Sequence, residues 1–316
     1  MSDIVVYVRS QPQLGDQIVA FATLYQLKAW WPTKRIKVVA RDDVGPIYHA
    51  LPWVDEFQRV RTLLDYTRSL SARTQMSVNL HHSSERFGLI NLLRLPAVRL
   101  GFRNARLSDV VWTHCHRKDE AEYIGLANLR LLAAYRPLDA EDSARRCFAE
   151  LARAHRRVDG RADVVFLPGG GAGPFKRWSV AHYLRLADRL KTLLGPDTRY
   201  TFALGRQEAR EHAELTALRR ADIQVAYCRP LAELSAIMLG ARLVVANDCG
   251  PSHVAQATGV PYVGIFNQPN PEWFWRRRHA VAVVPRQPRD GINTIAPDQV
   301  LQACARALAG TPRATA

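Results

Sequence analysis

The sequence predicts an α/β fold made of two doubly wound, Rossmann-like domains. Short apolar runs alternate with longer amphipathic segments, this alternation starts again near the middle of the chain, and 316 residues are enough for two ordinary domains. An order of strand, helix and strand favours parallel strands joined by right-handed crossovers. We therefore expect an N-terminal domain over residues 1–150 and a C-terminal domain over residues 151–316.

The first half opens with the clearest strand–helix–strand unit. Residues 4–8 and 36–40 are apolar runs typical of buried strands, and residues 18–31 between them carry apolar side chains at helical spacing. Weaker strand signals follow at residues 60–64, 76–80 and 97–100. A helix is expected over residues 122–135, and residues 137–163, rich in Arg, Ala and acidic residues, are expected to form a helix and the connection between the domains.

The second half repeats the pattern with stronger signals. Strands are expected at residues 164–167, 200–204, 223–227, 243–246 and 262–266. Helices are expected at residues 180–194, 207–220, 231–239 and 251–258. In doubly wound sheets ligands bind beyond the carboxyl ends of the strands, so a cleft between the loop edges of the two halves is the expected site.

Composition narrows the class of protein. The apolar fraction of 47% fits a globular chain, no apolar stretch reaches the roughly 20 residues that cross a bilayer, and the first strand follows the start of the chain in place of a secretory signal. Five scattered cysteines without C-x-x-C spacing argue against a disulfide framework and a structural zinc site. These features predict a cytoplasmic protein.

The charge balance indicates an anionic partner. A formal net charge of +15 favours nucleic acid, an acidic membrane leaflet or a phosphorylated substrate. Nothing in the sequence resembles a zinc finger, an RNA-recognition motif or a basic zipper. We therefore expect no nucleic-acid partner, although charge alone leaves that class open.

The first candidate loop, residues 9–16, follows the first strand. It lacks the G-x-G-x-x-G pattern, which disfavours a nicotinamide or flavin dinucleotide cofactor. Asp16 lies where the next helix starts. Its carboxylate either stabilises the helix dipole or projects into the cleft, where it takes a proton from a hydroxyl nucleophile.

The second candidate loop, residues 168–178, contains four glycines followed by Lys176 and Arg177. Glycines let the backbone approach a ligand closely, and the two cations supply donors for an anion. The spacing differs from a Walker A motif. The alternative is a plain flexible turn.

The third candidate loop, residues 247–253, runs from a buried strand into a helix with Pro251 in its first turn. Such a turn directs free backbone N–H groups and the positive end of a helix dipole at one point, which suits a phosphate. Asp248 is alternatively a capping residue, and His253 a core histidine. Together with the glycine-rich loop, this turn gives two anion sites on one edge, as a diphosphate requires.

These loops resemble glycosyltransferase family 9, the ADP-heptose:lipopolysaccharide heptosyltransferases. The resemblance spans nearly the whole chain and rests on Leu-Gly-Asp at residues 14–16, Gly-Pro-Phe-Lys-Arg-Trp at residues 173–178, Asp-Cys-Gly-Pro-Ser-His at residues 248–253, and Gly-Ile-Phe at residues 264–266. The second of these looks most like the heptosyltransferase II branch. The resemblance implies a GT-B fold, an inverting reaction, no metal and no cofactor, with the nucleotide sugar bound by the C-terminal domain. It also raises the expectation that the last helix packs back on the N-terminal domain.

Roles for single residues follow from this resemblance. Asp16 is expected to be the general base and Lys176 to neutralise the diphosphate. The other expected donor-binding residues are Gly170, Gly171, Arg177, Glu208 for the ribose, Asp248 for the sugar, His253 as support, and Cys249, Gly250 and Ser252 for the phosphate through their N–H groups. Cys249 departs from the family pattern, which has a small hydroxyl residue there, so the identity of the donor sugar is open.

The acceptor half carries weaker signals. Arg61, His82 and Arg86, with the aromatic and basic residues 273–278, are candidates to meet an anionic glycolipid, with ordinary surface and packing roles as the alternative. The resemblance implies a lipopolysaccharide-core acceptor and peripheral contact with the inner face of the bacterial inner membrane. A family member using another nucleotide sugar or glycan, and a non-catalytic scaffold that binds a nucleotide or polyanion, remain the competing hypotheses.

Overall fold

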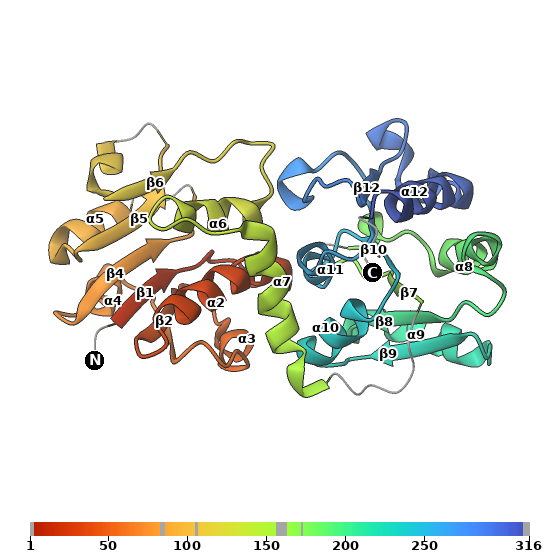
Figure 1. Cartoon of the computed structure of the whole chain (residues 1–316), viewed down its shortest axis with the longest axis horizontal. Coiled ribbons are helices and arrows are strands. Elements are labelled where there is room, and N and C mark those ends of the chain that lie inside the picture. Colours follow the sequence, from red (N-terminus) through yellow and green to blue (C-terminus); the bar gives the residue numbers. More distant parts are fainter. Residues whose placement is uncertain (1–2, 83–85, 105–106, 156–162, 172, 312–316) are drawn as a thin grey trace. The chain divides into compact units, whose positions relative to one another are not determined.

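The computed structural model describes residues 3–82, 86–104, 107–155, 163–171 and 173–311 (Figure 1). The chain forms two compact units, Met1–Cys147 and Phe148–Ala316. The division falls inside helix α7 (Ala140–Leu151). The expected domain limits at residues 150 and 151 stay a prediction, and each unit is described here by itself.

The N-terminal unit contains a parallel sheet of six strands in the order β3-β2-β1-β4-β5-β6. Their bounds are β1 (Asp3–Tyr7), β2 (Arg35–Ala40), β3 (Glu56–Arg59), β4 (Thr74–Asn79), β5 (Val98–Phe102) and β6 (His114–His116). Val6 of β1 lies between Val38 and Val78 of its neighbours, and all three are fully buried. The strand order reverses direction between β1 and β4, the position where ligands bind in such sheets.

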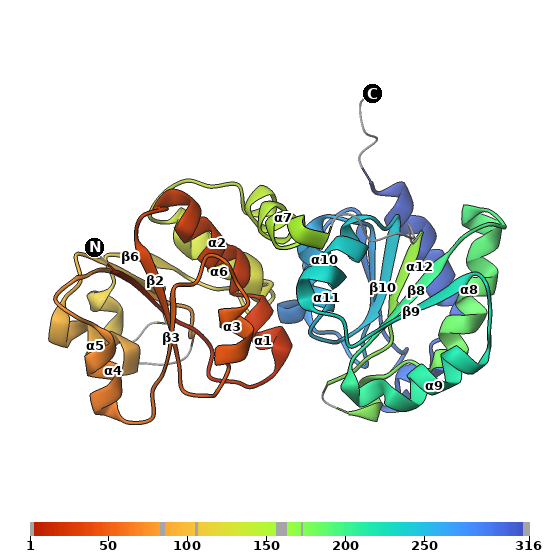
Figure 2. The same ribbon diagram turned by 90° about the horizontal axis from the view of Figure 1, so that it is seen from below.

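Helices cover both faces of this sheet, with α4 and α5 on one side and α2 and α6 on the other (Figure 2). The helices of this unit are α1 (Leu14–Ile18), α2 (Phe21–Trp30), α3 (Gly45–His49), α4 (Leu63–Ser69), α5 (Arg86–Arg94), the 3-10 helix η1 (Leu107–Val111), α6 (Ile124–Ala133) and α7. The helix expected over residues 18–31 is α2, which begins at Phe21, and the short helix α1 precedes it. The expected strand at residues 60–64 is wrong: the strand is β3, and the apolar residues after it begin α4, where Thr62 and Asp65 form a capping box.

The C-terminal unit repeats the same topology. Its parallel sheet has the order β12-β11-β10-β7-β8-β9, with β7 (Val164–Leu167), β8 (Tyr200–Leu204), β9 (Ile223–Tyr227), β10 (Leu243–Asn247), β11 (Tyr262–Ile265) and β12 (Ala280–Val283). If β7 is counted as the first strand, the strand order is the same as in the sheet of the N-terminal unit. The strand order reverses direction between β7 and β10. The prediction of an α/β fold with two doubly wound halves is confirmed.

The core of the second unit is aromatic and lies between its sheet and two long helices. The two long helices are α8 (Val180–Leu194) and α12 (Pro297–Ala309). The other helices of this unit are η2 (Arg153–His155), η3 (Pro174–Lys176), η4 (Arg206–Glu208), α9 (Ala209–Ala217), α10 (Leu231–Leu239), α11 (Ser252–Thr258), η5 (Pro271–Trp273), η6 (Pro288–Asp290) and η7 (Ile292–Thr294). The Phe166 ring lies 5.0–5.6 Å from the rings of Tyr183, Tyr200 and Phe202. The last helix, α12, packs on α8 and on β10, β11 and β12; that it also reaches the N-terminal domain stays a prediction. Among the described residues, none of the helices combines the length and the apolar character that crossing a bilayer demands.

Candidate functional site

A buried asparagine joins the two candidate loops of the second unit. Asn247, the last residue of β10, is fully buried; its Nδ2 donates to the carbonyl oxygen of Pro168 over 2.7 Å, and its Oδ1 accepts from the Tyr183 hydroxyl over 2.9 Å. Because Pro168 directly follows β7, this amide holds the glycine-rich loop beside the turn after β10. Sequence reasoning missed this role, since an Asn after an apolar run is also typical of an ordinary turn.

Lys176 and Asp248 meet at this junction. The Lys176 Nζ lies 2.5 Å from Asp248 Oδ2, and both side chains are largely shielded from solvent. Lys176 is held at the end of η3, in the loop after β7, and Asp248 follows β10. The structure therefore brings together the two loops of this unit that the sequence singled out.

The turn between β10 and α11 uses some of the expected phosphate-binding N–H groups in its own internal hydrogen bonds. The N–H and the hydroxyl of Ser252 both donate to the Cys249 carbonyl oxygen, over 3.1 and 2.7 Å, and the His253 N–H donates to Gly250 over 3.2 Å. The Ser252 N–H is therefore committed inside the turn, which argues against its expected phosphate role. In the part of the chain that the structure describes, the N–H groups of Cys249 and Gly250 have no acceptor, so these two remain candidates. Pro251 precedes the helix as its N-cap and does not lie in its first turn.

Arg177 is already paired with carboxylates. Its guanidinium lies 3.1 Å from Glu208 Oε1 and 3.4 Å from Glu211 Oε1. Glu208 is buried and also accepts the Gly205 N–H over 3.0 Å. Arg177 thus has its charge balanced within the protein and connects Gly170, whose carbonyl its Nε contacts at 3.4 Å, to η4. Lys176, by contrast, pairs directly with Asp248 of the turn.

Two groups beside the turn are kept neutral. Burial lowers the pKa of His253 to about 4, the nearby Asp248 carboxylate opposes this, and the Lys176 cation adds to it. Burial also raises the pKa of the Cys249 thiol to about 12. At neutral pH the imidazole is uncharged and the thiol protonated, so neither competes with Lys176 for an anion. The His253 ring lies 5.3 Å from the Trp273 ring.

The buried His253 makes the stability of the protein depend on pH. Its pKa is about 6.5 in an unfolded chain and about 4 in the fold, so below pH 6.5 the unfolded state binds a proton that the folded state refuses. We expect the free energy of unfolding to fall by about 3 kcal/mol as pH drops from 6.5 to 4, and His253→Gln to reduce that loss. Urea unfolding at several pH values measures this, with the exposed His49→Gln as control; an equal slope in both variants would contradict it.

In the first unit, Asp16 lies in α1 beside the end of β1. Its Oδ1 is 3.2 Å from Arg9 Nε, and both side chains are mostly shielded from solvent. Gln17 holds this loop: its Nε2 donates to the carbonyls of Arg9 and Gln11 over 3.2 and 2.5 Å, and the Tyr48 hydroxyl donates to its Oε1 over 2.7 Å. Asp16 is therefore an ion-paired carboxylate on a rigid loop. Sequence reasoning did not identify Arg9 as its partner.

His82 lies near the same reversal point of the first sheet. Burial, then the cations Lys118 and Arg9, lower its pKa to about 3, so it is neutral at physiological pH. Its ring packs against Phe102 at 4.2 Å between centroids, and its Nε2 lies 3.5 Å from Asn128 Oδ1. Because β1 and β4 are neighbouring parallel strands, the loops after them leave the sheet at the same edge.

The other acceptor candidates are less favourably placed. Arg61 is exposed after β3, the edge strand of the sheet, and its N–H donates to Asp65 over 3.0 Å. Arg86 begins α5, but its side chain lies outside the described residues. In the segment of residues 273–278, Phe274 and Trp275 are buried, and Arg277 stacks 4.5 Å over the Trp275 ring. The aromatic rings of that segment are therefore mostly packed, whereas Arg276 and Arg278 are exposed.

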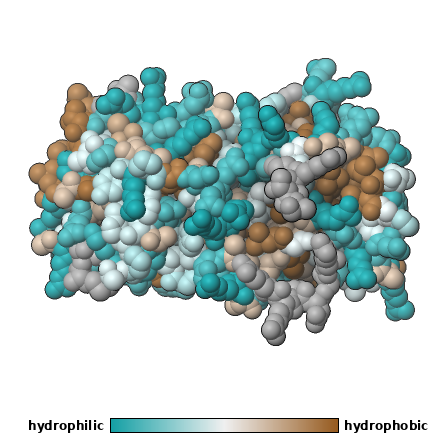
Figure 3. Space-filling model, viewed as in Figure 1, coloured by the Kyte–Doolittle hydropathy of each residue, from teal (hydrophilic) through white to brown (hydrophobic). Residues whose placement is uncertain are grey.

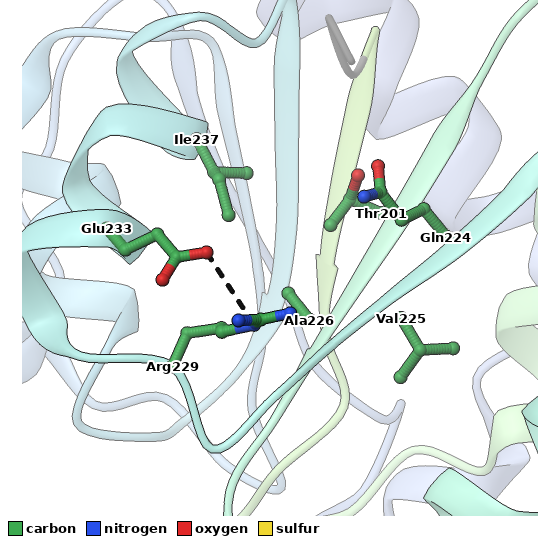
Figure 4. A pocket seen from close by; sticks show the side chains of 7 residues that line it. All are labelled: Thr201, Gln224, Val225, Ala226, Arg229, Glu233 and Ile237. Atoms are coloured by element: carbon green, nitrogen blue, oxygen red, sulfur yellow. Dashed lines mark ion pairs between the residues drawn. The ribbon is translucent and has the colours of Figure 1, made fainter. Parts of the chain in front are cut away.

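A small hollow of about 30 Å³ lies between α10 and the middle of β8 and β9 (Figure 4). It is lined by Thr201, Gln224, Val225, Ala226, Arg229, Glu233 and Ile237, and Arg229 and Glu233 pair across it at 3.6 Å. This volume suits a water molecule and not a nucleotide, which needs several hundred Å³. None of the expected donor-binding residues lines it. Over the described ranges, no group of three or more His, Cys, Asp and Glu side chains is arranged to hold a metal ion.

Comparison with known proteins places the chain in a family. The family model for glycosyltransferase family 9 (heptosyltransferase) matches residues 97–289, more than half of the chain and including both loops of the second unit. The chain belongs to glycosyltransferase family 9. Like other family 9 structures, it has the α/β, GT-B type of architecture with two Rossmann-like units.

Several individual proteins that are similar to this chain in sequence or in fold are heptosyltransferases. Lipopolysaccharide heptosyltransferase 2 of Escherichia coli K12 is 32% identical over 133 residues, 39% of this chain and only 36% of the relative. Lipooligosaccharide heptosyltransferase 2 of Haemophilus ducreyi is 24% identical over 295 residues, 82% of each chain. The structure of E. coli heptosyltransferase WaaC with ADP superposes with a TM-score of 0.68 at 16% identity, covering 95% of this chain and 98% of that one. This last likeness concerns the fold.

Proposed function

We propose that the protein is an inverting, metal-independent glycosyltransferase that moves a heptose from ADP-heptose to an anionic lipopolysaccharide inner-core acceptor. Family 9 membership supports the reaction class. The observation that carries the proposal is the junction of Lys176, Asp248 and the turn before α11 at the reversal point of the second sheet. There a cation and open N–H groups offer charge and hydrogen bonds to a diphosphate.

The second unit is proposed to hold the donor and stabilise the leaving group. As the bond between the anomeric carbon and the β-phosphate oxygen breaks, negative charge grows on the diphosphate. Lys176 neutralises part of it, and the N–H groups of Cys249 and Gly250 donate to its oxygens. Asp248 contacts the sugar while it positions the Lys176 ammonium, and Glu208 receives the ribose hydroxyls.

The first unit is proposed to activate the acceptor. A hydroxyl oxygen of the acceptor attacks the anomeric carbon from the face opposite the diphosphate, which inverts the configuration, and its proton passes to the Asp16 carboxylate. Arg9, whose Nε lies 3.2 Å from Asp16 Oδ1, orients that carboxylate before the acceptor binds. The products are the glycosylated acceptor, ADP and a proton.

A donor screen tests the proposal. ADP-heptose is expected to raise the Tm of the protein by several degrees at concentrations about 100-fold above its Kd, and UDP-sugars to raise it much less. Mass spectrometry then follows transfer to a heptose-deficient lipopolysaccharide core. A larger shift with a UDP-sugar supports a family member with another donor, whereas donor binding without transfer to any core acceptor supports a non-catalytic scaffold.

Alanine substitutions at two neighbouring glycines test whether the diphosphate lies close to the backbone of the glycine-rich loop. A Cβ at Gly171 meets no atom within 4 Å, whereas one at Gly170 lies 2.9 Å from Arg177 Cγ. We expect Gly171→Ala to keep the Tm of the free protein but weaken ADP binding about tenfold, because the methyl group occupies the ligand's space. Gly170→Ala is expected to lower both Tm and affinity by displacing Arg177. Unchanged ADP affinity in Gly171→Ala, measured by calorimetry, would place the donor elsewhere.

The acceptor and location belong to the same proposal. The net charge of +15 suits a phosphorylated, carboxylate-bearing glycolipid. We propose a cytoplasmic enzyme that works at the inner face of the bacterial inner membrane. His82 and the exposed Arg61 are proposed acceptor contacts, to which Arg86 is added from the sequence alone.

A further inference from the structure

An exposed apolar surface lies on the N-terminal unit, where α4, α5 and η1 contact one another in series. We define this leucine patch by six side chains, each more than half exposed: Leu63, Leu89, Leu92, Leu93, Leu107 and Val110. Figure 3 shows apolar atoms at the left margin of the view, where Figure 1 places α5. At about 100 Å² for each side chain, the patch reaches or exceeds the largest apolar patches of ordinary soluble monomers.

The exposed leucines of α5 lie on a helix whose opposite face is packed into the N-terminal unit. Its inward face carries Ile90 and Asn91, both buried, and the Ser77 hydroxyl donates to the Asn91 side-chain oxygen. Its outward face carries leucines at positions 89, 92 and 93, the spacing of one helical stripe. A surface helix of a water-soluble protein normally has the reverse arrangement, with its polar face outward. The outward stripe therefore fits an apolar surrounding.

The surface around the leucine patch is basic. Residues 61–112 contain eight arginines against three acidic residues, and Arg68, Arg94 and Arg103 are exposed there. The two acidic residues with described side chains are turned to their own loops: Asp65 accepts N–H groups of residues 61 and 62, and Asp109 accepts that of residue 104. Exposed leucines with exposed arginines on the same helices, Arg68 on α4 and Arg94 on α5, match the apolar boundary and the negative headgroups of an anionic bilayer. A second copy of the same face would bring like charges together.

We propose that the leucine patch docks the N-terminal unit on an anionic lipid bilayer. The leucines of α5 enter the boundary between headgroups and acyl chains, and the exposed arginines contact lipid phosphates. The inference rests on the proposed function, because an enzyme whose acceptor is anchored in a membrane gains from being held at that surface. It assigns this contact to α4, α5 and η1, not to the aromatic and basic residues 273–278, whose rings are mostly packed inside the second unit.

Vesicle flotation of the full chain tests the docking. Wild-type protein is expected to float with vesicles of about one part phosphatidylglycerol to three parts phosphatidylethanolamine, and to remain unbound with phosphatidylcholine alone. The double variant Leu92→Ser/Leu93→Ser is expected to lose vesicle partition about tenfold or more. Leu107→Ser/Val110→Ser, on η1, provides a second variant should the first fail to fold.

The matched control replaces two exposed leucines of the other unit. Leu193→Ser/Leu218→Ser changes similarly exposed side chains and is expected to float like wild type. Equal loss in this control, or equal binding to neutral vesicles, overturns the proposal. A wild-type dimer that becomes a monomer in Leu92→Ser/Leu93→Ser, seen by light scattering, also overturns it and assigns the patch to a second copy.

Flotation is measured without the nucleotide-sugar donor, so its result does not depend on sugar transfer. The docking proposal and the proposed function can therefore be rejected independently of each other. Vesicle binding without heptose transfer rejects the function alone. Transfer to a deacylated acceptor by a protein that binds no vesicle rejects the docking alone.

Discussion

Replacing Asp16 by Asn is expected to lower kcat at least ~100-fold while the Kd for ADP changes little. The amide has the shape of the carboxylate but cannot accept the proton of the acceptor hydroxyl. Asp16 lies in the first unit, whereas the residues proposed to hold ADP lie in the second, so donor affinity is not expected to depend on its charge. Steady-state kinetics with a core acceptor and calorimetry with ADP measure the two quantities.

The control for this experiment is Asp43→Asn. Asp43 is an exposed carboxylate of the same unit, 3.5 Å from Arg59, and its change is expected to leave kcat within about a factor of two. A fully active Asp16→Asn enzyme would falsify the assignment of Asp16 as the base. If neither the wild type nor any variant transfers sugar, the scaffold hypothesis is favoured.

Replacing Lys176 by Met is expected to reduce kcat about 100- to 1,000-fold and to weaken ADP binding as well. Methionine keeps most of the length of the side chain but removes the ammonium group and its charge beside the β10–α11 turn. It also leaves the Asp248 carboxylate, 2.5 Å from the lost ammonium, without its cation, so a diphosphate would meet an uncompensated negative charge. Both effects weaken donor binding. They raise the barrier to transfer still more, because the leaving diphosphate gains negative charge in the transition state.

The matched control is Lys191→Met, because Lys191 also pairs with a carboxylate in the second unit, Asp222, at 2.7 Å. It lies on α8 away from the turn and is expected to keep kcat and the Kd for ADP near those of wild type. If both lysine variants lose activity equally, the loss reflects general stability and Lys176 has no special place in catalysis.

Much of the fold could be predicted because its central strands are continuous apolar runs. Strands buried on both faces, such as β1, β7 and β10, leave a signal that needs no tertiary information. The short edge strands β6 and β12 are only half buried and one reads His-Cys-His, so their sequences give no such signal. Strand β3 was misplaced because its alternate residues are polar, whereas the apolar residues after it form a helix.

The candidate site was predictable in part. Glycines and a lysine after one strand, and an Asp-x-Gly turn after another, identified the two loops that the Lys176–Asp248 ion pair joins. The partners of charged groups were not predictable, because Arg9 beside Asp16 and the carboxylates around Arg177 depend on tertiary packing. The leucine patch was missed for a similar reason: leucines at helical spacing predict a buried face, and only the fold shows that α5 turns them outward. Whether Asp16 acts on the same substrate complex as Lys176 stays a prediction.

The buried amide of Asn247 couples the two loops that are proposed to bind the donor. A substitution that shifts the segment after β7 is expected also to shift the segment after β10, because the Asn247 side chain hydrogen-bonds the first and begins the second. Changes placed in the two segments should therefore combine non-additively in double-mutant cycles, even for pairs of residues other than the ion-paired Lys176 and Asp248. Converting the enzyme to a different nucleotide sugar would then require paired rather than single replacements.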